Sequence, residues 1–239
     1  MAKPQEGRCL TGIEGLDQIT GGGFPLGGLV HISGSCGSGK SSLVNEFLLR
    51  GAADGHKAAL ITTVHSVQKT LDSMSHLEIF DERLVKDKVL RVIDVADLLE
   101  DLSHPGRPIE SNGAMELLSE IEGMIGKQGA KRLAIDSISP LLMEMEAGAA
   151  RNFIKKLSET VYAKKCTTVV VSDCEEGAGK TYVPCDGLVR LSNIERQGNV
   201  LRVLQVLKMQ GAAHSRSRYV FDVTSSGMLL TPMLRGGFH

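Results

Sequence analysis

The chain has 239 residues, of which 42% are hydrophobic and 23% charged, and these values exclude a disordered protein. The 27 basic and 28 acidic residues give a formal net charge of −1, so the chain lacks the positive excess of a dedicated nucleic-acid-binding protein. Five cysteines without a CxxC pair argue against a disulfide framework or a zinc ribbon and favour a reducing, cytoplasmic location. No apolar run reaches the roughly 18 residues of a membrane span.

The first two thirds of the chain alternate short apolar runs with segments of helical apolar spacing. Predicted strands cover residues 28–33, 58–64, 89–95, 131–135 and 167–172, and predicted helices cover residues 41–50, 67–76, 114–126 and 149–165. Residues 104–112 are rich in turn formers and predict a surface loop. This alternation predicts an α/β fold with a mostly parallel sheet between helices.

The alternation ends after the strand at 167–172. Three further strand-like runs, at residues 187–192, 200–209 and 218–223, are separated only by short segments. Such spacing predicts an antiparallel extension of the sheet over residues 186–239. With an N-terminal segment at 1–27, we expect one domain over residues 1–239.

A phosphate-binding loop carries the strongest functional signal. Residues 34–41 read GSCGSGKS, which satisfies GxxxxGK[ST] between a predicted strand and a predicted helix. Glycines let the backbone N–H groups close around a polyphosphate, and Lys40 is expected to reach the β and γ phosphates. The predicted nucleotide-binding residues are Ser35, Cys36, Gly37, Ser38, Gly39, Lys40, Ser41 and Ser42.

A magnesium site is expected beside this loop. The Ser41 hydroxyl is the residue type that ligates Mg²⁺ in such loops. Asp136 ends the apolar run LAI, so its carboxylate is expected at the carboxyl edge of the sheet, where it can fix the metal. The alternative is that Asp136 only caps the segment that follows it.

Four segments together resemble KaiC-like ATPases of the RecA superfamily. They lie at residues 11–43, 134–142 (AIDSISPLL), 169–173 (VVVSD) and 207–228. The resemblance implies a RecA-like P-loop core that binds ATP or ADP with Mg²⁺ and assembles into rings, usually hexamers. The family that these segments resemble also includes recombinase-like DNA-binding accessory proteins and the archaeal flagellar ATPase-like subunit.

Two departures from that family's pattern bear on hydrolysis. Hydrolytic relatives carry a Glu-Glu pair that activates water where this chain has Val64 and His65. The relatives' KxRG motif, whose Lys and Arg act on the neighbouring subunit's nucleotide, is matched here by Lys208 and Gln210. Loss of an arginine finger costs on the order of a thousandfold in rate. His65 is a candidate for the base and Lys208 for the trans cation.

The pattern therefore predicts an ATP-binding protein with weak or absent hydrolysis that acts as an oligomeric regulator or scaffold with an unidentified protein partner. An active ATPase is one alternative. A DNA-binding accessory protein is the other, supported by the basic residues Arg151, Lys155, Lys156, Lys164 and Lys165 and by the loop at 174–184 but disfavoured by the net charge. ATP is preferred to GTP because the chain has no NKxD sequence.

Overall fold

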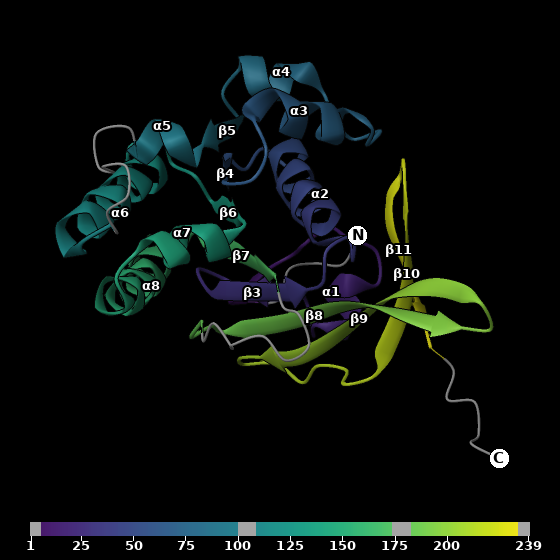
Figure 1. The fold of residues 1–239 in the computed structure, drawn as a ribbon. Helices are drawn as coiled ribbons and strands as arrows, with labels where there is room; N and C mark the ends of the chain where they lie inside the picture. Colours follow the sequence, from purple (N-terminus) through teal and green to yellow (C-terminus); the bar gives the residue numbers. More distant parts are fainter. Residues whose placement is uncertain (1–5, 100–108, 174–182, 234–239) are drawn as a thin grey trace.

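The computed structural model describes residues 6–99, 109–173 and 183–233, and its elements are labelled in Figure 1. The helices are α1 (Leu16–Ile19), α2 (Lys40–Ala53), α3 (Val67–Ser75), α4 (Glu82–Lys86), α5 (Val95–Leu99), α6 (Ser111–Gly126), α7 (Ile138–Glu144) and α8 (Ala147–Lys164). The strands are β1 (Arg8–Cys9), β2 (Phe24–Pro25), β3 (Leu29–Gly34), β4 (Ala58–Thr62), β5 (Leu90–Asp94), β6 (Arg132–Asp136), β7 (Thr167–Asp173), β8 (Gly187–Arg196), β9 (Asn199–Met209), β10 (Arg218–Thr224) and β11 (Gly227–Pro232).

A nine-stranded sheet forms the centre of the molecule, in the order β11-β10-β9-β8-β3-β7-β6-β4-β5. The strands from β8 to β5 in this order are parallel neighbours, whereas β9, β10 and β11 join by antiparallel pairing. The predicted fold class is thus confirmed: a mostly parallel sheet with helices and antiparallel C-terminal strands. β8 joins the two parts of the sheet, because it pairs parallel with β3 and antiparallel with β9.

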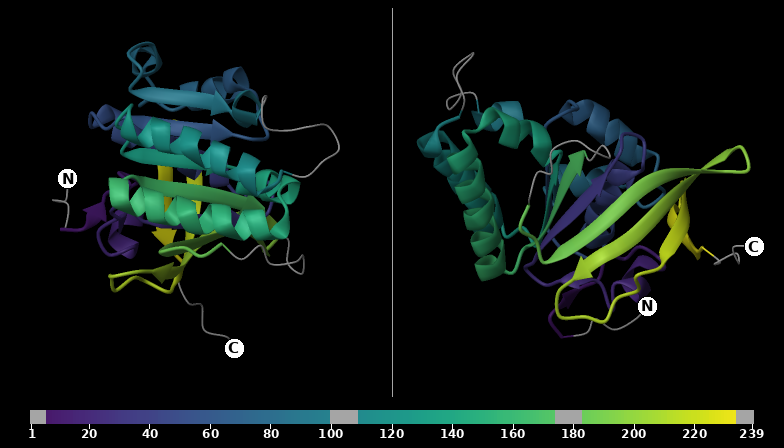
Figure 2. Two further views of the ribbon diagram at one scale, coloured as in Figure 1. Left: turned by 90° about the vertical axis from the view of Figure 1, so that its left-hand side faces the viewer. Right: turned by 60° about the horizontal axis from the view of Figure 1, so that its bottom comes forward.

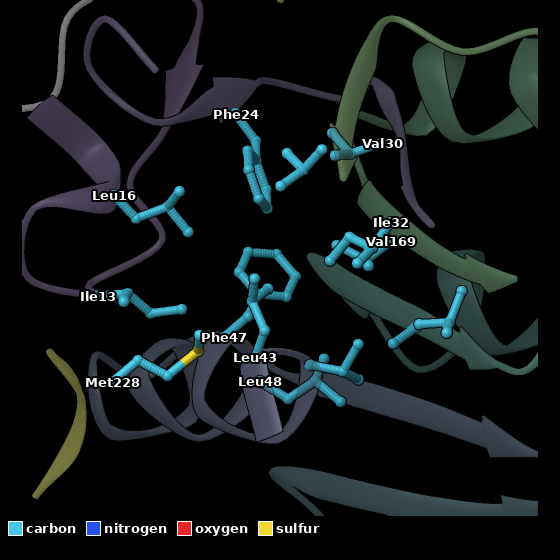
Figure 3. Packing of buried hydrophobic residues seen from close by; sticks show 14 of the residues in the cluster. Ile13, Leu16, Phe24, Val30, Ile32, Leu43, Phe47, Leu48, Val169 and Met228 are labelled. Carbon is cyan, nitrogen blue, oxygen red and sulfur yellow. The ribbon is translucent and has the colours of Figure 1, made fainter. Parts of the chain in front are cut away.

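Each face of the sheet packs against its own set of helices (Figure 2). On one face α6 and α8 cover the strands, and Leu29 of β3 contributes to this cluster. On the other face Val30 and Ile32 of the same strand pack toward α2 and Phe47 (Figure 3). Alternate residues of β3 therefore enter opposite clusters, which explains why the whole strand is buried, including its polar residues His31 and Ser33.

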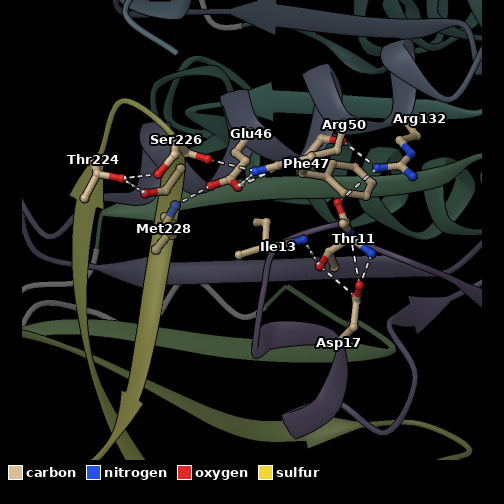
Figure 4. A network of polar contacts seen from close by, with 12 residues as sticks. Thr11, Ile13, Asp17, Glu46, Phe47, Arg50, Arg132, Thr224, Ser226 and Met228 are labelled. Atoms are coloured by element: carbon tan, nitrogen blue, oxygen red, sulfur yellow. Dashed lines mark hydrogen bonds and ion pairs between the residues drawn. The ribbon is translucent and has the colours of Figure 1, made fainter. Parts of the chain in front are cut away.

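Polar contacts fasten α2 to the segments around it (Figure 4). The buried Glu46 carboxylate accepts a hydrogen bond from the Met228 backbone N–H at 2.7 Å and pairs with Arg50 at 3.0 Å, which ties β11 to the helix. Burial raises the pKa of Glu46, and the bonds from Met228 and Arg50 oppose that rise. On the other side Arg132 donates to the Phe47, Leu10 and Thr11 carbonyl oxygens. These contacts hold α2 in place behind the phosphate-binding loop.

His31 makes the stability of the fold depend on pH. It lies buried on β3 with its Nε2 2.6 Å from the Ser172 Oγ, and burial lowers the pKa of His31 from 6.5 to about 4. Between pH 6.5 and pH 4, His31 is protonated in the unfolded chain but stays neutral in the folded chain. The free energy of unfolding is therefore at its full value above pH 6.5 and decreases as the pH falls toward 4, by about 3 kcal/mol in total.

This prediction is checked by urea unfolding at a series of pH values. The comparison is His31→Gln, which keeps a hydrogen-bonding side chain but does not titrate. We expect the difference in unfolding free energy between the two proteins to shrink as the pH falls from 6.5 to 4. A difference that stays constant over that range would contradict it.

Several sequence-based boundaries need correction. The strand expected at 58–64 ends at Thr62, and α6 begins at Ser111, three residues earlier than expected. Most of the surface loop expected at 104–112 lies outside the described residues. Its described part includes Ile109, which is not on the surface but 3% exposed and bridged to Met145. The sequence did not predict this contact, because Ile109 is a single apolar residue within a stretch rich in turn formers.

Candidate functional site

The phosphate-binding loop joins the end of β3 to the start of α2. Gly39 is the residue before α2 and has φ +93°, a conformation that side chains other than glycine rarely adopt. A Cβ at Gly39 would also meet the Phe221 ring at 3.1 Å. Gly34 has no room for a side chain either, because the Leu191 carbonyl oxygen and the Ser38 hydroxyl approach it closely. The glycines are therefore fixed by the neighbouring strands as well as by the turn.

Lys40 folds back over the loop instead of pointing into solvent. Its side chain is only 9% exposed. The ammonium donates to the Gly34 and Ser35 carbonyl oxygens, each at 2.8 Å, and lies 3.0 Å from the Asp173 carboxylate. The positive charge thus sits inside the curve of the loop at the N-terminus of a 14-residue helix, where anions are favoured by the free N–H groups and the helix dipole.

Asp136 is the last residue of β6, and the Ser41 side chain lies close enough to lower the pKa of its carboxyl. Burial raises the pKa of Asp136, while the Ser41 hydrogen bond, Lys40 and His65 oppose that rise. Asp136 is not the cap of the next helix: the Ser137 side chain holds that position and accepts from the Ser139 N–H at 3.3 Å. The structure therefore brings Ser41 and Asp136 together, and a hydroxyl beside a carboxylate is a donor set that suits Mg²⁺.

Val64 and His65 follow β4 at the same edge of the sheet. Thr62 pairs with Asp136, and the Thr63 hydroxyl exchanges hydrogen bonds with the Ser137 backbone at 2.7 and 2.8 Å, which fixes the start of this turn. Val64 is 59% exposed and His65 is also exposed. The two residues therefore lie in an exposed turn beside Asp136, and Val64 offers no group that accepts a proton; a role for His65 as a base stays a prediction.

Lys208 is not near the phosphate-binding loop of its own chain. It pairs with Leu188 of β8, which in turn pairs with His31, three residues before the end of β3. That register places it roughly 10 Å along the strands from Gly34. Its ammonium donates to the Cys185 carbonyl oxygen at 2.6 Å and the residue is exposed. A role for Lys208 in trans stays a prediction.

A pocket beside the loop was missed from the sequence. Its volume is about 420 Å³, and Ser42 of α2 lies in its wall. Other lining residues are Asn45, Ser73, Leu77 and Val223. They come from α2, from the end of α3 and the residues that follow it, and from β10, so no local motif indicates the pocket.

Arg202 was also missed. Its Nε lies 3.4 Å from the Gly37 carbonyl oxygen, so β9 brings a cation against the loop within one chain. The sequence gives Arg202 only as a residue of the predicted strand at 200–209, without a motif.

Among the described residues no helix is long and apolar enough to cross a membrane.

Comparisons with protein families, curated proteins and solved structures all find KaiC-like proteins. Residues 9–234 match the model of the KaiC ATPase family. The chain is 30% identical over 235 residues to a UPF0273 protein of Methanocaldococcus jannaschii, covering 94% of this chain and 96% of the relative. It is 28% identical over 233 residues to the circadian clock oscillator protein KaiC of a Nostoc species, covering 93% of this chain but 44% of that relative. Its fold is similar to that of a solved KaiC-like protein from Pyrococcus horikoshii, with TM-score 0.80, 23% identity and coverage of 94% and 99%.

Proposed function

Because this chain belongs to the KaiC ATPase family, we propose that it binds ATP with Mg²⁺, hydrolyses it slowly or not at all, and acts as a nucleotide-dependent oligomeric regulator. The observation that carries the proposal is the placement of Lys40, whose ammonium is held inside the loop at the N-terminus of α2. A buried cation there matches the charge of a polyphosphate.

In this proposal the chain's own residues divide the work of binding. The N–H groups of the loop and Lys40 hold the phosphates, while the Ser41 hydroxyl and the Asp136 carboxylate hold Mg²⁺, which neutralises phosphate charge when bound. The pocket beside Ser42 takes the nucleoside. Leu77 and Val223 offer apolar contact to a base, and Asn45 and Ser73 offer polar groups at its edge.

Slow hydrolysis is supported by two departures from the pattern of the relatives. Val64 and His65 stand after β4 in place of a carboxylate pair. Gln210 stands in place of the arginine that in the relatives acts on the neighbouring subunit's nucleotide. A base contributes about a hundredfold to ten-thousandfold to rate, so an occupied site would persist without turnover. In this proposal the oligomer responds to whether ATP is bound, and not to its hydrolysis, and the oligomer resembles those of the family.

A DNA-binding function has less support. Lys155 of α8 pairs with Glu159 at 4.0 Å, and a groove between α6 and α8 mixes Glu122 and Glu159 with Lys156 and Lys164. The helix face proposed for DNA is therefore of mixed charge, which gives little attraction to phosphates. The loop at 174–184 lies largely outside the described residues.

The test is a measurement of nucleotide content, phosphate release and molar mass on one purified sample of the wild type and of Lys40→Ala. We expect Lys40→Ala to bind ATP about thirtyfold more weakly, since it loses charge-assisted hydrogen bonds worth about 2 kcal/mol. The wild type should retain ATP and release no more phosphate than the variant. Rapid phosphate release by the wild type would favour the active ATPase, and equal ATP affinity of both proteins would overturn the proposal.

A further inference from the structure

Asp173 is a carboxylate at the phosphate-binding loop to which the sequence assigns no role. It is the last residue of β7, between the strands that end at the loop and at Asp136, and it lies opposite Gly34 in the β3–β7 register. Its Oδ1 lies 3.0 Å from the Lys40 Nζ. Its side chain is 57% exposed, so it has room to move.

The hydrogen-bonding capacity of the Lys40 ammonium is fully used in this structure. It has three N–H donors, and it meets three acceptors: the Gly34 and Ser35 carbonyl oxygens at 2.8 Å and the Asp173 carboxylate at 3.0 Å. A phosphate that binds Lys40 must take the place of one of them. The two carbonyls belong to the loop backbone, whereas Asp173 is exposed, so the carboxylate is the group that gives way.

After this exchange the carboxylate stays within reach of the incoming phosphate, because the Asp173 backbone is paired with Gly34 of the loop. Asp136 is also close, since Lys40 lowers and Asp173 raises the pKa of its carboxyl, but Asp136 has Ser41 and the expected metal position to compensate its charge. Asp173 has lost its cation and faces the terminal phosphate, which carries more negative charge in a triphosphate than in a diphosphate. Like charges at this range oppose binding.

We infer that Asp173 sets the preference of this site between ATP and ADP: it competes with the phosphates for Lys40 and opposes the γ-phosphate of bound ATP. The inference rests on the proposed nucleotide-binding function. Asp173 then lowers the affinity for ATP more than the affinity for ADP. An oligomeric regulator with little hydrolysis would in this way respond to the ATP to ADP ratio instead of being filled permanently with ATP.

The experiment is calorimetric titration of Asp173→Asn and wild type with Mg-ATP and with Mg-ADP. Asparagine keeps the size and removes the charge. We expect the ratio of ATP to ADP affinity to rise about tenfold in Asp173→Asn, as for one like-charge contact removed near a solvent-exposed site. Asp173→Glu, which restores the charge, should return the ratio to the wild-type value.

Asp54→Asn is the matched control, since it removes the same charge at the opposite end of α2 and should leave the ratio unchanged. An unchanged ratio in Asp173→Asn, or weaker ATP binding in it, overturns the inference while Lys40-dependent binding still stands. Binding of ATP that does not depend on Lys40 would instead overturn the proposed function. A merely structural role of Asp173 would shift both affinities together and leave their ratio constant.

Discussion

Replacing both Val64 and His65 by glutamate is expected to raise ATP turnover about a thousandfold, because it places a carboxylate pair that can accept a proton where the chain has a valine and a histidine. The positions follow β4 next to Asp136, and Val64 is 59% exposed, so the new side chains meet no packed neighbours. Steady-state phosphate release at saturating Mg-ATP measures the change. The gain should vanish when Lys40→Ala is added, since the phosphates are then no longer held.

The matched control for this prediction is the variant with glutamine at both positions. Glutamine has the shape of glutamate but does not take up a proton, so turnover should stay at the wild-type level. Equal activation by glutamine and glutamate would show that flexibility of the turn, and not a base, limits the reaction. A wild type that already matches the glutamate variant would show that another residue activates the water.

The parts of the site that lie within one stretch of chain were predictable from the sequence. The loop motif, with Lys40 and Ser41, needs only a strand, a tight turn and a helix, all of which are local. Asp136 was predictable because the end of an apolar run marks the end of a parallel strand. The structure brings Asp136 into contact with Ser41 across about a hundred residues of sequence, as the order of the strands requires.

The parts that depend on distant segments were not predictable. Asp173 reaches Lys40 because β7 is inserted between β3 and β6, and the sequence of alternating strands does not give this order. The pocket beside Ser42 needs Val223 from β10, a strand whose antiparallel pairing brings the far end of the chain back to α2. The short helices α4, α5 and α7 were also missed, because each has too few residues for a periodic pattern.

Arg132 was likewise predicted only as a strand residue, although it links α2 to the N-terminal segment by hydrogen bonds. It is 2% exposed, it lies 4.7 Å from the Phe47 ring centroid, and it donates to three carbonyl oxygens. Burial lowers its pKa, since no carboxylate is bound to it among the described residues. A charge in this position is retained only where backbone acceptors surround it, and those acceptors come from α2 and the N-terminal segment.

Gly51 of α2 leaves the space that Arg132 fills, and Gly51→Ala is expected to destabilise the protein by about 4 kcal/mol. The new Cβ would lie on top of the Arg132 Nε and Cδ. Overpacking costs roughly 1–3 kcal/mol, and an arginine that moves away also loses hydrogen bonds worth about 1.5–3 kcal/mol each. Urea unfolding gives the change in free energy directly.

Gly123→Ala provides the matched control, because Gly123 lies inside α6 with nothing within 4 Å of its added Cβ. There the same substitution should stabilise the protein by up to about 1 kcal/mol through helix propensity. The double variant Gly51→Ala/Arg132→Ala tests the cause: if the clash with Arg132 is responsible, the second substitution should cost far less in the Gly51→Ala background than in the wild type. Additive costs would place the damage in α2 itself, and a Gly51→Ala protein as stable as the wild type would mean that Arg132 does not occupy this position in solution.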